Sequence, residues 1–237
     1  MNPRVGVPFL VALLLASSWA FTNQSVIDEW VRESQFESNE EEDALLPIQT
    51  DEHWLVLVAD FPEQQATEAW GVTQAELMLN DIATSYIEQL TNNQTELTVV
   101  VHDQVTRASA NVATYGADYS GDRDTNSAGD FLPMNLAEEV VRLRADDVNW
   151  TQFDLDNDGI VDRLLILHTT KGQEENPGQS NNIWSHFTRF EEPIKVSSEH
   201  TVGHYTMASL RTGSSGMGTI LHEICLLYTS PSPRDRG

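Results

Sequence analysis

Short apolar runs alternate with segments of helical periodicity along the chain. Residues 53–60 form a continuous apolar run that ends in Asp-Phe-Pro, and residues 96–101 are rich in β-branched side chains. Residues 164–168 form a further apolar run. Runs of this length and composition are typical of buried strands. Two shorter extended segments are predicted at residues 183–186 and 203–207.

Two helices are predicted between these strands, and a third near the end. Thr73 and Glu76 have the spacing of a capping box, so a helix is expected from there to about residue 90. Its apolar stripe comprises Ala75, Met78, Ile82, Tyr86, Ile87 and Leu90. A second helix is expected over residues 136–147, with Asn135 as its cap. The last helix should begin near Gly218. This alternation predicts an α/β (or α+β) fold in which helices pack on a mixed sheet.

The segment 154–162 reads Asp-Leu-Asp-Asn-Asp-Gly-Ile-Val-Asp. Carboxylates on alternate residues before a turn glycine can place oxygen ligands around a hard cation. The predicted ligands are the side chains of Asp154, Asp156, Asp158 and Asp162 with the carbonyl of Ile160. An EF-hand is not expected, because its twelfth position would hold Leu165 instead of Glu and a strand follows. The candidate ion is calcium, and the alternative is an acidic turn without an ion.

The N-terminus has the layout of a secretory signal. Arg4 precedes a short apolar run, and Ser18-Trp19-Ala20 supplies small residues at the cleavage positions. A signal peptide is therefore expected over residues 1–20, and the protein should be extracellular. Residues 21–50 contain a dense acidic run and are expected to form an acidic arm or the remnant of a pro-segment.

The chain is strongly acidic. It has 237 residues and a formal charge of −24. Nucleic acids and anionic membranes repel such a surface, so neither is an expected partner. Cys225 is the single cysteine and cannot form an internal disulfide. No stable membrane insertion is expected, and the sequence does not predict the oligomeric state.

Gly216–Glu223 reads Gly-Met-Gly-Thr-Ile-Leu-His-Glu. In the zinc-peptidase motif His-Glu-x-x-His, two His one turn apart on a helix reach one metal ion, and the Glu lies beside them. His222 and Glu223 match the first half, but the second His position holds Leu226. His200 and His204 have the same spacing, yet the residues between them favour a strand or turn, where the rings would not converge on a metal.

The order of several segments resembles the secreted zinc metalloproteases of the immune inhibitor A type. The segments are 58–61, 113–118, the Asp-rich stretch 154–162, 183–186, 205–207 and 218–223. The resemblance spans about residues 50–224. It implies a zincin-like fold, protein or peptide substrates, His222 as a zinc ligand and Glu223 as the catalytic acid/base.

Residues 225–237 have no zincin character and look like the translation of a sequencing-library adapter. The predicted organisation is therefore a signal peptide (1–20), an acidic arm (21–50), the N-terminal part of a metalloprotease domain (51–224) and a non-native tail (225–237). The alternative is a natural tail on a degenerate, secreted calcium-binding domain without catalysis.

Overall fold

The computed structural model describes residues 45–175, 177–211 and 216–228. The predicted signal peptide, nearly all of the acidic arm and most of the predicted tail lie outside these residues. Within them, six strands form one mixed sheet. Five of them follow the order β2-β1-β4-β6-β5, and the short β3 pairs with β1 at Ala59 and Asp60, past the residues of β1 that pair with β2. The strands are β1 (Asp51–Asp60), β2 (Glu96–Val101), β3 (Thr106–Arg107), β4 (Leu164–His168), β5 (His186–Lys195) and β6 (Thr201–Ser209). All pairs are parallel except β5 with β6.

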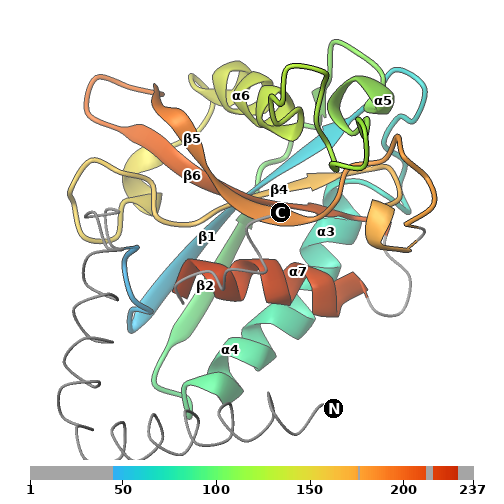
Figure 1. Ribbon diagram of the computed structural model, residues 1–237. Helices are drawn as coiled ribbons and strands as arrows, with labels where there is room; N and C mark the ends of the chain where they lie inside the picture. The colour runs from blue at the N-terminus through green and yellow to red at the C-terminus, as the bar shows by residue number, and fades with distance from the viewer. Residues whose placement is uncertain (1–44, 176, 212–215, 229–237) are drawn as a thin grey trace, which may run out of the picture. The chain divides into compact units, whose positions relative to one another are not determined.

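Helices cover both faces of the sheet, which makes the fold mixed α/β (Figure 1). One face packs against α6 (Pro133–Arg144) and the 3₁₀ turn η2 (Trp150–Phe153). The other face packs against α7 (Gly216–Cys225) and a helical segment made of α3 (Val72–Met78), the π turn η1 (Leu79–Ala83) and α4 (Thr84–Leu90). Alternate residues of β1 enter the two cores, because successive strand side chains point to opposite faces. This explains why the central strands read as continuous apolar runs.

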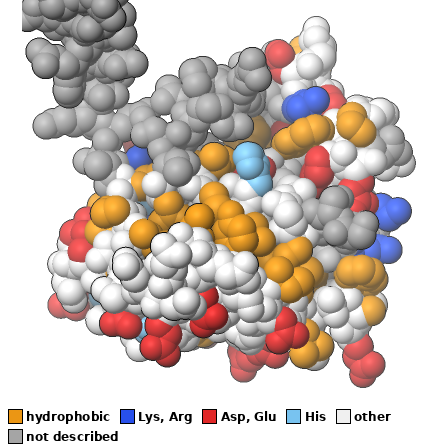
Figure 2. All heavy atoms as spheres, turned by 90° about the horizontal axis from the view of Figure 1, so that it is seen from below, with side chains coloured by type: hydrophobic (Ala, Val, Ile, Leu, Met, Phe, Trp, Pro, Cys, Tyr) orange, Lys and Arg blue, Asp and Glu red, His pale blue; other side chains and the backbone are white. Residues whose placement is uncertain are grey.

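The structure corrects the predicted details of the first helix. It begins at Val72 after Gly71 as N-cap, so Thr73 lies inside the helix and the predicted capping box is wrong. The buried side chains are Ala75, Leu79, Ala83 and Ile87, whereas Leu90 and two other members of the predicted stripe, Ile82 and Tyr86, are exposed. Hydrophobic side chains are accordingly visible among polar ones on the face formed by α3, α4 and α7 (Figure 2).

Two further boundaries differ from expectation. The helix α6 begins at Pro133 after Leu132 as N-cap, so Asn135 lies within its first turn and does not cap it. The antiparallel strand β5 begins at His186 and ends at Lys195, so it overlaps the segment 183–186 that was predicted to be extended at one residue only. Small elements that were not predicted include α5 (Val112–Tyr115) and the 3₁₀ turn η3 (Gln173–Glu175).

In the part of the chain that the structure describes, no helix is long and apolar enough to cross a membrane.

Candidate functional site

The acidic loop 154–162 brings three carboxylates together. Asp154, Asp156 and Asp162 each offer one oxygen, and these atoms all lie within 4.8 Å of one another. Asp154 and Asp162 are buried, whereas Asp156 is exposed. Among the described residues, this is the one group of at least three His, Cys, Asp or Glu side chains that converges closely enough to hold a metal ion. Oxygen-only donor sets favour hard cations such as calcium.

Hydrogen bonds inside the loop fix its turn. The carboxylate of Asp154 accepts from the backbone N–H groups of Asp158 and Gly159, both at 3.0 Å. Asp158 Oδ1 accepts from the N–H of Ile160 at 2.7 Å, so Asp158 supports the turn and does not join the converging oxygens. Gly159 has a positive φ of 88°, and a Cβ there would lie 2.9 Å from Glu199 O. Glycine is therefore required at this turn.

The start of β6 holds the loop from the other side. Thr201 pairs with Ile160 in an isolated parallel bridge, and its N–H donates to Gly159 O at 2.8 Å. His200 lies just before β6, and its Nε2 is 3.5 Å from Asp154 Oδ2. His204 Nε2 is 2.9 Å from Asp162 O. The two rings therefore lie against different parts of the loop.

Burial makes ionisation of the carboxylates in this loop unfavourable when no cation is bound. Loss of solvation raises the pKa of Asp162 to about 6, although the N–H of Leu155 and the charge of Arg163 oppose this shift. Burial also raises the pKa of Asp158, and Asp156 and Asp154 raise it further by charge repulsion. A bound divalent cation would replace this repulsion with attraction. The loop geometry and its electrostatics therefore both favour cation binding.

We expect calcium to stabilise the protein through this loop. Binding that is restricted to the folded state adds about 2.7 kcal/mol when free calcium is 100-fold above its dissociation constant. Thermal unfolding with and without calcium should show a clear rise in Tm for the wild type and a much smaller rise for Asp156→Asn. The exposed Asp146→Asn is the matched control. An equal rise in both variants would contradict a cation site in this loop.

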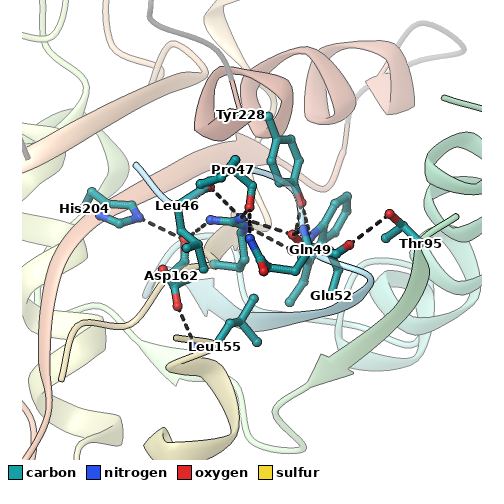
Figure 3. A network of polar contacts seen from close by, with 11 residues as sticks. Leu46, Pro47, Gln49, Glu52, Thr95, Leu155, Asp162, His204 and Tyr228 are labelled. Atoms are coloured by element: carbon teal, nitrogen blue, oxygen red, sulfur yellow. Dashed lines mark hydrogen bonds and ion pairs between the residues drawn. The ribbon is translucent and has the colours of Figure 1, made fainter. Parts of the chain in front are cut away.

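A buried ion pair lies directly after the loop (Figure 3). Arg163 Nε and Nη2 donate to the Glu52 carboxylate at 2.9 and 3.1 Å, and neither side chain is more than 1% exposed. Arg163 also donates to the carbonyls of Leu46 and Pro47. Burial lowers the pKa of Arg163, but the hydrogen bonds to Glu52 outweigh this effect and the net shift is upward. Arg163 therefore stays charged and joins the loop to β1.

His204 makes the stability of the folded protein depend on pH. Burial lowers its pKa from 6.5 to about 4. The unfolded chain therefore takes up a proton below pH 6.5 that the folded chain does not, and stability present above pH 6.5 is lost as the pH falls towards 4. Two and a half pKa units correspond to at most about 3 kcal/mol.

Between pH 7 and pH 4, we expect the free energy of unfolding of the wild type to fall by up to about 3 kcal/mol more than that of His204→Gln. Urea unfolding of both proteins at each pH measures this difference. Because the two values are subtracted, the titration of groups common to both proteins cancels. His102→Gln, at a ring that is hydrogen-bonded within its own loop, is the control. A difference that does not change with pH would show that His204 takes up its proton equally in both states.

The predicted His-Glu pair lies on α7, which follows β6 and packs against the sheet. His222 is exposed, whereas Glu223 is only 8% exposed. Consecutive residues are about 100° apart around a helix, which accounts for the different environments of the two side chains. The position of the second His holds Leu226, which is buried in the 3₁₀ turn η4 (Leu226–Tyr228) after α7 ends.

The described residues do not complete a zinc site around His222. No group of three potential ligands in these ranges includes it. The segment after it is integrated in the fold: Tyr228 accepts a hydrogen bond from Trp54 Nε1 at 2.8 Å and donates to Glu52 at 3.1 Å. The predicted start of a non-native tail at Cys225 stays a prediction.

Sequence reasoning did not find His200, Glu52 or Arg163 as neighbours of the acidic loop. Glu52 and Arg163 are 111 residues apart, and no local pattern signals their pairing.

Comparisons with known proteins do not identify the site. No protein-family model matches the chain, and a search of curated proteins finds no significant match.

Proposed function

We propose that the chain is the N-terminal part of a secreted zinc endopeptidase of the zincin type, in which α7 is the active-site helix. The observation that carries this proposal is the place of His222 and Glu223. They lie on a helix that comes directly after a strand of the sheet and packs on its face, and the imidazole of His222 is exposed. The ordered resemblance to the immune inhibitor A type supports the same function.

In this proposal His222 would hold zinc through a ring nitrogen, and the other ligands would come from outside the described residues. Zinc would act as a Lewis acid at the scissile carbonyl. Glu223 would accept the proton of the attacking water and pass it to the leaving amine. The substrate would be a protein or peptide.

The edge of the sheet offers a place for such a substrate. β5 is the last strand of the described sheet, pairs only with β6 there, and contacts α7. Extended peptides commonly bind by pairing their backbone with a sheet edge. A peptide paired with β5 would run beside the helix that carries His222 and Glu223.

The 237-residue chain itself should have no measurable peptidase activity, because Leu226 stands where the second His is required. Casein cleavage by the purified chain, with and without added zinc, measures this. Zinc-dependent cleavage by this chain would refute the expectation. Sequencing the gene past codon 224 tests its cause: we expect a His codon at position 226, and a native stop near codon 237 would contradict it.

The second candidate function is a secreted calcium-binding domain without catalysis. The convergence of Asp154, Asp156 and Asp162 favours it specifically. Calcium binding by the loop is compatible with both functions and does not separate them. A confirmed gene sequence without a second His would favour the calcium-binding domain.

A further inference from the structure

A second group of unpaired oxygens lies away from the acidic loop, around Asp124. This residue is 1% exposed, and its Oδ2 accepts from the N–H of Trp184 at 3.0 Å. Its Oδ1 is buried and has no hydrogen-bond partner among the described residues. A buried carboxylate oxygen without a partner loses its hydration and gains nothing in return. The fold therefore leaves a strong acceptor unsatisfied at this position.

Gln173 presents a second unsatisfied acceptor to the same neighbourhood. It is 1% exposed, and its Oε1 is buried without a hydrogen-bond partner in the part of the chain that the structure describes. Its Nε2 donates to Asp118 Oδ2 at 2.7 Å, while Asp118 Oδ1 accepts from the N–H of Asp124 at 3.1 Å. Asp118 therefore joins the two residues that carry unpaired oxygens. Each carboxylate oxygen has two lone pairs, so Asp118 can still offer an oxygen to a cation.

The surroundings of these oxygens are negative. The pKa of Asp124 is raised to about 7: burial is the largest cause, the hydrogen bond from the N–H of Trp184 opposes it, the charges of Asp118 and Glu174 add to it, and Arg123 opposes it to a smaller extent. Glu174 lies against Gly172, where a Cβ would come within 2.3 Å of its Oε1. A side chain at position 172 would therefore displace this carboxylate from its position. Asp118 and Glu174 are thus close enough to Asp124 for their charges to act on it, and among the described residues Arg123 supplies the opposing positive charge.

We propose that Asp124 Oδ1, Gln173 Oε1 and the carboxylate of Asp118 bind a hard divalent cation, with calcium as the best match to an all-oxygen set of this kind. The cation satisfies both unpaired acceptors and offsets the repulsion between the carboxylates. It fastens the loop after α5 to η3 and to the segment that leads into β5. The site is separate from the acidic loop 154–162, and it does not depend on peptidase activity.

Calcium stoichiometry of the 237-residue chain, measured by titration calorimetry, tests the proposal. Asp124→Asn keeps the size of the side chain and removes its charge, so this variant should bind one calcium ion fewer than wild type. Asp122→Asn, at an exposed position in the same loop, should bind as many as wild type. Combined with Asp156→Asn, Asp124→Asn should remove a further ion beyond the one that the acidic loop loses.

An unchanged stoichiometry in folded Asp124→Asn would overturn the proposal. So would a gain in stability of this variant over calcium-saturated wild type, because Asp124 would then be a protonated carboxyl that needs no ion. If Asp124→Asn does not fold, terbium replaces calcium as the probe. Trp184→Phe retains all the proposed ligands, and tryptophan-sensitised terbium luminescence should fall while the stoichiometry stays that of wild type. Luminescence equal to that of wild type would contradict a cation beside Trp184.

Discussion

Replacing Arg163 with Met is expected to cost about 3–5 kcal/mol of unfolding free energy, because it leaves Glu52 as an uncompensated buried charge. Glu52 is fully buried, and its remaining donors are the N–H of Gln49 and the hydroxyl of Tyr228. The loss is measured by urea unfolding in calcium-free buffer, which separates the ion pair from any effect on the acidic loop.

A double variant and a surface control distinguish this effect from general damage. Glu52→Gln combined with Arg163→Met removes both charges and should recover much of the loss. Arg142→Met breaks an exposed pair with Glu138, 3.7 Å apart, and should change stability by less than about 1 kcal/mol. A loss for Arg163→Met no larger than that for Arg142→Met would contradict a structural role of the buried pair.

Replacing Glu223 with Gln in the product of the complete gene is expected to lower kcat by about 10²–10⁴-fold, because the amide cannot accept the proton of the attacking water. Zinc content should stay unchanged, since Glu223 is not a proposed ligand. The measurement is kcat and KM for a peptide substrate together with metal analysis of each protein.

Glu76→Gln, at an exposed position on α3, is the matched control and should keep the activity of wild type. Thermal unfolding of both variants checks that Gln is tolerated at the buried position 223. Full activity of a folded Glu223→Gln protein with bound zinc would exclude Glu223 as the proton acceptor.

The central strands were predictable because their signal is local. In β1 and β4 nearly every residue is buried on one face or the other, so the sequence there is continuously apolar. The edge strand β5 was mostly missed, since its first four residues are half-buried and it contains exposed Glu191 and Glu192. An edge strand with mixed exposure gives no clear period.

The first helix shows a different limit. The buried face is carried by Ala75, Leu79, Ala83 and Ile87, four residues apart. Two of these are alanines, whereas the larger Ile82 and Tyr86 face outward, and a π turn interrupts the helix between residues 79 and 83. A stripe chosen by size and regular period therefore includes the buried Ala75 and Ile87, but it also takes in exposed residues and misses Leu79 and Ala83.

The candidate sites also differ in whether their signal is local in the sequence. Spacing within nine residues was enough to predict the acidic loop, and the structure brings Asp154, Asp156 and Asp162 together. The approach of His200, the Arg163–Glu52 pair and the group around Asp124 depend on segments that meet only in the folded chain. For His222 and Glu223, a helix was predicted and found, while their joint role in zinc chemistry stays a proposal.

The central proposal is that α7 begins a zinc peptidase site. Its most direct test is casein cleavage by the product of the complete gene, measured before zinc removal, after removal by a chelator and after zinc is added back in calcium-containing buffer. The proposal predicts cleavage that is lost with zinc and restored by it. Cleavage that does not depend on zinc, or a zinc-loaded and folded protein that does not cleave, would contradict it.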